Sequence, residues 1–116
     1  MSKIKQKVLQ DGKIVVVELS GNYVGGDETD ELRNEIKKLS EAGNLNLVMD
    51  LGEVSYLNST ALGVLISAHA NYTKIGGKIK LCQLNKNLEN LFVITKLSLI
   101  FDTYPSQIEA IASFAA

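Results

Sequence analysis

Cysteine and histidine each occur once in this chain of 116 residues, and tryptophan does not occur. The single cysteine, Cys82, cannot form an internal disulfide bond, and the single histidine, His69, cannot build a multi-histidine metal site. These shortages argue against a secreted disulfide scaffold and against a metalloenzyme. We therefore expect a protein that needs no metal and no other cofactor.

The chain also lacks an excess of positive charge. Lysine and arginine together number 12, against 13 aspartates and glutamates, for a net charge of −1. Proteins that bind nucleic acids usually carry a basic surplus that neutralises phosphates. We therefore expect no nucleic acid among the partners.

Long apolar runs are missing as well. The longest are interrupted by polar residues, so no transmembrane helix and no direct membrane insertion are predicted. No apolar run follows the charged residues at the N-terminus, which argues against a signal peptide. Together with one reduced cysteine, this predicts a cytoplasmic location.

The composition that is present is typical of an ordinary globular domain, with 46% hydrophobic and 22% charged residues. A chain of this length can bury one core without disulfides or metal ions. We expect a single domain over residues 1–116.

The order of apolar patterns along the chain predicts an α/β fold. Residues 14–19 are β-branched and almost entirely apolar, which is typical of a central strand covered on both faces, and Asp11-Gly12 before them is a hairpin signal. Further strands are predicted at 4–9, 45–51, 78–84 and 99–101, with a short apolar piece at 54–57, and helices are predicted at 27–42, 60–75, 85–95 and from Pro105 onward. The prediction is an N-terminal β-hairpin and a small mixed, mostly parallel sheet of four to five strands, covered by about four helices.

The segment around Asn58-Ser59-Thr60 contains three good helix-capping residues in a row. Taken alone they indicate a capped helix. The helix behind them is apolar on two sides, however. One stripe comprises Ala61, Val64, Leu65, Ala68, Tyr72 and Ile75, and a second comprises Leu62, Ile66 and His69. One stripe can pack on the sheet, and the second indicates a surface for a partner.

The run Asp50-Leu51-Gly52-Glu53-Val54-Ser55-Tyr56-Leu57-Asn58-Ser59-Thr60-Ala61-Leu62-Gly63-Val64 resembles the signature of the STAS domain family. The resemblance implies a stand-alone bacterial anti-sigma factor antagonist that regulates sigma-factor-dependent transcription. In this family an anti-sigma factor that is also a serine kinase binds the domain and phosphorylates the first serine of the motif, here Ser59. A metal-dependent serine phosphatase reverses the reaction. Around this phosphoacceptor we expect the partner-binding residues Asn58, Thr60, Ala61, Leu62 and Ile66.

Three hypotheses follow, and Ser59-Thr60 favours the first, a phosphorylation-controlled protein-binding module. Asn58 and Ala61 stand where the family usually has Asp and Gly, which favours a second: an accessory or scaffold subunit of a transport ATPase or signalling assembly, without phosphorylation. A third, a small enzyme or ligand carrier, is disfavoured because no second polar cluster is visible. We expect a protein without catalytic activity, present as a monomer or weak dimer.

Overall fold

A computed structural model describes residues 3–10, 12–24 and 26–115. Within these residues the chain forms one five-stranded sheet and four α-helices. The elements are β1 (Lys3–Leu9), β2 (Ile14–Tyr23), α1 (Gly26–Glu41), β3 (Asn46–Leu57), α2 (Ser59–Lys74), β4 (Lys78–Cys82), α3 (Lys86–Ile94), the 3₁₀ turn η1 (Leu97–Leu99), β5 (Asp102–Tyr104), α4 (Gln107–Ala112) and the 3₁₀ turn η2 (Ser113–Ala115). The predicted fold class is confirmed.

The strands follow one another across the sheet in the order of the sequence, β1-β2-β3-β4-β5. The pair β1–β2 is antiparallel, and the other three pairs are parallel. The N-terminal hairpin is therefore confirmed, although Asp11 of its predicted turn lies outside the described residues.

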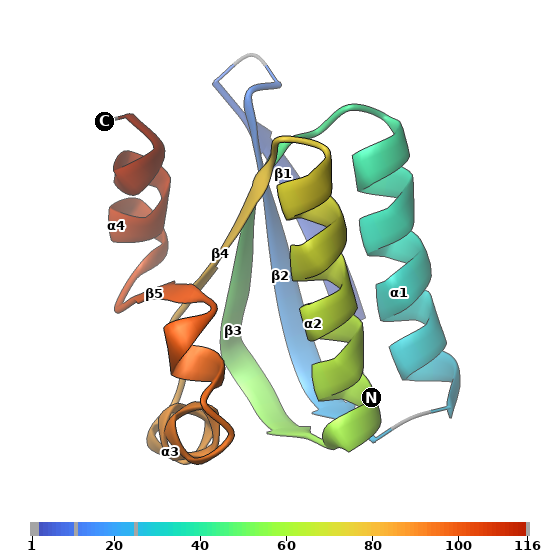
Figure 1. Cartoon of the computed structure of the whole chain (residues 1–116), viewed down its shortest axis with the longest axis vertical. Coiled ribbons are helices and arrows are strands. Elements are labelled where there is room, and N and C mark those ends of the chain that lie inside the picture. Colours follow the sequence, from blue (N-terminus) through green and yellow to red (C-terminus); the bar gives the residue numbers. More distant parts are fainter. Residues whose placement is uncertain (1–2, 11, 25, 116) are drawn as a thin grey trace.

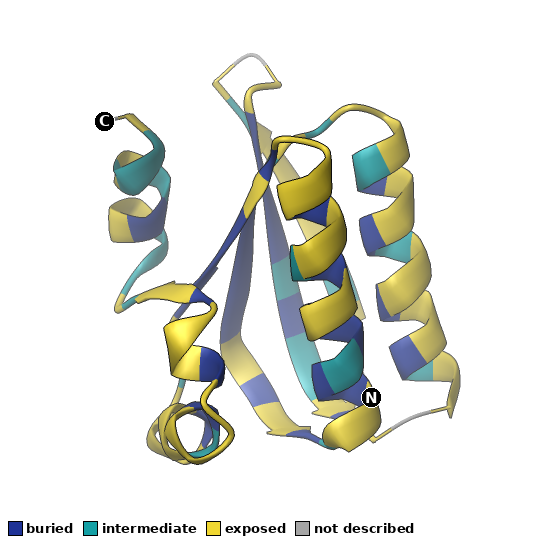
Figure 2. Ribbon diagram, viewed as in Figure 1, coloured by how far each residue is buried: buried dark blue, intermediate teal, exposed yellow. Residues whose placement is uncertain are grey.

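The two faces of the sheet are covered unequally. Figure 1 shows α1 and α2 side by side on one face and α4 on the other. The larger core lies under α1, α2 and α3, and the buried residues of α1 and α2 face the sheet (Figure 2). A smaller core lies under α4 and contains Ile14, Val16, Val48, Cys82 and Ala110. The apolar residues of 14–19 are thus buried against both layers, as their pattern predicted, and Glu18 is partly buried.

Two strands are longer than predicted. Ser20-Gly21 does not end β2, because the strand continues to Tyr23 through shifts in its register with β3. Gly21 has a φ of 102° there, a conformation that glycine adopts readily. Likewise Gly52 does not end β3. It lies at an irregularity in the pairing with β2, where its N–H donates to Asp50 Oδ1 (2.8 Å), and pairing resumes at Glu53 and continues to Leu57.

The predicted edge strand at 99–101 is wrong. Residues Leu97–Leu99 form a 3₁₀ turn, and the edge strand β5 follows at Asp102–Tyr104. Leu97 and Phe101 are instead buried in the larger core. The spacing of these two apolar residues fits a helical turn, which explains why a strand was the wrong interpretation.

We predict that the backbone amides of residues 14–19 are among the slowest to exchange in hydrogen–deuterium exchange. Both neighbouring strands pair with β2 and both of its faces are covered, so exposing these amides requires extensive unfolding. Amides on the outer edge of β1 serve as the internal control and should exchange faster. Rapid labelling of β2 with protection confined to the helices would contradict the described core.

Candidate functional site

The start of α2 is held in place by the ends of β2 and β3. Tyr23 pairs with Leu57, and the next amide, Asn58 N–H, donates to the carbonyl oxygen of Tyr23 (2.9 Å). Asn58 has an extended backbone and caps the helix, because its Oδ1 accepts the N–H of Ala61 (2.9 Å). The predicted cap is therefore present, and the helix begins at Ser59.

Ser59 and Thr60 are the first two residues of α2, and both are exposed. Neither side chain has a hydrogen-bond partner among the described residues. The structure thus brings together Asn58, Ser59 and Thr60 as predicted, with the Ser59 hydroxyl open to an incoming group.

The other predicted contact residues are placed differently. Ala61 is 0% exposed and Leu62 is 8% exposed, so both side chains belong to the larger core. Ile66 is 40% exposed. His69 packs edge-on against Phe101, with 5.0 Å between the ring centres. Ala61 and Leu62 therefore offer little side-chain surface to a partner, and their role in partner binding stays a prediction.

Two exposed apolar residues at this end of the sheet were not predicted. Tyr56 is 53% exposed and Val24 is 51% exposed. The register pairs Asn22 with Tyr56 and Tyr23 with Leu57. Tyr56 therefore lies near the end of β3, just before Asn58, and Val24 directly follows the adjacent end of β2. Only the extension of both strands beyond their glycines brings them there, and neither extension was visible in the sequence.

The charges around Ser59 are uneven. The first turn of α1 carries Asp27 and Glu28, whereas the first turn of α2 has no acidic residue. Both helices begin at the same end of the sheet (Figure 1). The positive end of the α2 dipole is therefore not offset by acidic side chains of its own first turn.

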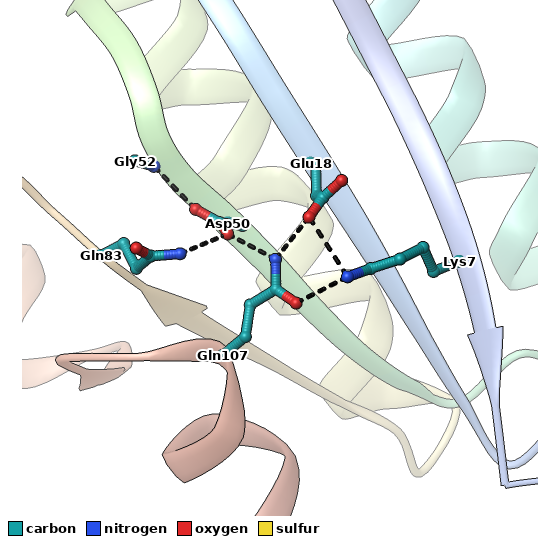
Figure 3. A network of polar contacts seen from close by, with 6 residues as sticks. All are labelled: Lys7, Glu18, Asp50, Gly52, Gln83 and Gln107. Atoms are coloured by element: carbon teal, nitrogen blue, oxygen red, sulfur yellow. Dashed lines mark hydrogen bonds and ion pairs between the residues drawn. The ribbon is translucent and has the colours of Figure 1, made fainter.

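A second polar cluster lies away from this segment, contrary to expectation (Figure 3). The Gln107 amide nitrogen donates to Glu18 Oε2 (2.6 Å) and Asp50 Oδ2 (2.5 Å), while its oxygen accepts from Lys7 Nζ (2.9 Å). Gln83 also donates to Asp50 Oδ2 (2.6 Å). The bond from Gln107, aided by Lys7, lowers the pKa of Glu18 despite its partial burial. These residues are far apart in the sequence, which is why no motif revealed them.

The cluster borders a cleft of about 460 Å³. Its lining residues are Lys5, Glu18, Leu19, Ser20, Asp50, Gly52, Glu53, Gln83 and Gln107, none of which belongs to the segment from Asn58 to Ile66. The described residues contain no group of three or more histidines, cysteines or carboxylates placed to hold a metal ion. In that same part of the chain, no helix combines the length and the apolar character needed to cross a bilayer.

The profile of the STAS domain matches residues 5–110, which is nearly the whole chain. The chain belongs to the STAS domain family.

Several STAS proteins are similar to it. An anti-sigma-B factor antagonist of Bacillus subtilis is 41% identical over 71 residues, spanning 61% of this chain and 64% of that protein. The aligned part thus covers less than two thirds of that relative. An anti-sigma factor antagonist from Mycobacterium paratuberculosis has the same fold, with a TM-score of 0.83, 21% identity and coverage of 98% of this chain and 96% of the other. The Bacillus cell fate determinant SpoIIAA in its phosphorylated form gives a TM-score of 0.74, 16% identity and coverage of 97% and 99%.

We predict that replacing the capping residue by Asn58→Ala lowers the free energy of unfolding by about 1 kcal/mol, because the N–H of Ala61 loses its acceptor. Asn58→Asp should retain the native stability, since a carboxylate can also accept this bond and suits a helix start. Urea denaturation measures both. Ser59→Ala is the matched control and should change stability by less than about 0.5 kcal/mol; equal losses in Asn58→Ala and Ser59→Ala would count against the described cap.

Proposed function

We propose that this STAS domain is a bacterial anti-sigma factor antagonist, a protein-binding module controlled by phosphorylation of Ser59. It binds an anti-sigma factor that is also a serine kinase, and so frees the sigma factor. A metal-dependent serine phosphatase restores the unmodified form. The protein acts in the cytoplasm, as one domain and without catalytic activity of its own.

The observation that carries this proposal is the exposed Ser59 hydroxyl at the start of a capped helix, within the family's motif. The names of the similar proteins from Bacillus and Mycobacterium support the antagonist role, and the phosphorylated form of SpoIIAA supports modification. Ala61, where the family usually has Gly, buries its methyl group in the core. That methyl group therefore leaves the approach of a kinase to Ser59 unobstructed.

The proposed partner surface surrounds this serine. Asn58, Thr60 and Ile66 remain in it, and Tyr56 and Val24 enlarge it with exposed apolar area. Exposed apolar groups beside a modifiable hydroxyl suit a partner that covers the serine completely. Ala61 and Leu62 act from the core, by holding α2 against the sheet.

Phosphorylation would eject such a partner for electrostatic reasons. A phosphate group adds about −1.5 to −2 charge at neutral pH. In the free domain the dipole of α2 stabilises this charge, so the fold is retained. In the complex the phosphate loses water, and one like charge at 4 Å costs about 4 kcal/mol at an effective dielectric constant near 20. A hundredfold loss of affinity needs only about 2.7 kcal/mol.

We predict that Ser59→Ala binds the anti-sigma partner constitutively. Ser59→Asp should bind at least about a hundredfold more weakly, because it places a negative charge in the interface. Both variants should melt at nearly the temperature of the unmodified protein, since the Ser59 side chain makes no hydrogen bond to another described residue. Calorimetric titration with the purified partner and thermal denaturation provide the two measurements.

The kinase reaction supplies the control. Incubation with the partner kinase and ATP should label the unmodified protein and Thr60→Ala but leave Ser59→Ala unlabelled. Equal binding of the partner by Ser59→Ala and Ser59→Asp would contradict control by phosphorylation and favour the scaffold hypothesis instead. Labelling of Thr60 or Ser55 with Ser59 untouched would show that the phosphoacceptor has been assigned wrongly.

The proposed absence of catalysis is tested separately. Catalytic groups must lie within about 3 Å of one another or be joined by one water molecule, and the Ser59 side chain makes no hydrogen bond to another described residue. We predict that the pure domain hydrolyses no carboxylic ester, phosphoester or nucleotide, with or without divalent cations. Hydrolysis that disappears in Ser59→Ala would overturn this prediction.

A further inference from the structure

The second face of the sheet is closed by a short segment, which we call the α4 strap (residues 106–115). Its helix has six residues, Gln107–Ala112, and begins at the cap Ser106, whose Oγ accepts the N–H of Glu109 (3.1 Å). A helix this short is not stable alone in water, where about 12 to 15 residues are needed. The strap is therefore helical because it is docked on the sheet.

Apolar burial contributes little to that docking. Of the six described residues of α4, Ala110 alone is buried, while Ile108 is 79% exposed. Ile111 and Phe114 are partly buried at the edge of the smaller core. Few buried apolar contacts are characteristic of segments that open locally at low free energy.

Polar contacts hold the strap at both ends. At its start Gln107 makes the three hydrogen bonds to Lys7, Glu18 and Asp50 shown in Figure 3. At its end the Lys80 ammonium, which is buried in the sheet face, donates to Ser113 Oγ (2.8 Å). The Lys80 nitrogen also lies 4.4 Å from the centre of the Phe114 ring, a cation–π contact. Charge-assisted bonds of this kind are stronger than neutral ones, but they are few and local.

The smaller core of the sheet lies beneath the strap. Ile14, Val16, Val48 and Cys82 are all buried there with Ala110. Burial raises the pKa of the Cys82 thiol to about 12, so the closed form holds it as an unreactive thiol. Opening of the strap would return this thiol to water and to ordinary reactivity.

We propose that the α4 strap is a conformational device, which opens and recloses as a unit while the five-stranded sheet and the helices on its other face stay folded. The polar contacts of Gln107 and Lys80 hold it in the closed form. The open form presents the second face of the sheet, an apolar surface that is absent from the closed form.

The test measures how fast Cys82 reacts with an aromatic disulfide reagent at increasing concentrations of urea. Opening of a small segment exposes little surface, so the reaction rate should be almost independent of urea until global unfolding takes over. The matched control is Val17→Cys in a Cys82→Ala background, which places a thiol on β2 under the opposite layer. It should react at least tenfold more slowly without urea, and its rate should rise steeply with urea from the start.

The polar contacts that hold the strap closed are tested by substitutions within the strap. Gln107→Ala should raise the Cys82 reaction rate at least tenfold, because it removes hydrogen bonds to two carboxylates. Ser113→Ala should raise it by a smaller factor, and the exposed control Ile108→Ala should change it less than twofold. Hydrogen–deuterium exchange should place the added mobility of Gln107→Ala in residues 106–115 and leave β2 protected. Equal rates and equal urea dependence for Cys82 and Val17→Cys, or no effect of Gln107→Ala, would overturn the proposal.

Discussion

The order of the strands is the constraint on which the rest of this structure depends. Each parallel strand from β2 onward is followed by its immediate neighbour in the sheet, always stepping in the same direction. Because parallel crossover connections are right-handed, successive steps in one direction place their helices on one face. That face receives α1, α2 and α3 and the larger core. The other face is left to the residues that follow β5, and this explains why so small a segment as α4 covers it.

Much of the fold could be predicted because local patterns and tertiary packing agree. The apolar run at 14–19 has to be covered on both faces, and caps such as Asn58 mark helix starts. The failures occur where tertiary pairing overrides local signals. Glycine at 21 and 52 indicates a turn when read alone, but β2 and β3 pair at Gly21 and resume their pairing directly after Gly52.

The position of the candidate site could be predicted from the sequence, but the burial of its neighbouring residues could not. A row of capping residues before an apolar helix indicates an exposed hydroxyl at a helix start, and Ser59 lies there. The burial of individual helix residues was not predictable, because Leu62 belongs to a core that elements from distant parts of the chain build together. The polar cluster around Gln107 joins four elements and leaves no trace in any local pattern.

The shared direction of the helices has an electrical consequence. Because α1, α2 and α3 each follow a parallel strand, all three begin at the same end of the sheet, where each contributes about half a positive charge. The acidic first turn of α1 offsets its own share, but the start of α2 remains positive in a protein whose net charge is −1. The proposed phosphate on Ser59 would outweigh that half charge and reverse the sign of the local field. Since local fields steer diffusing proteins toward or away from a surface, the modification would slow the encounter with an acidic partner surface before any contact forms.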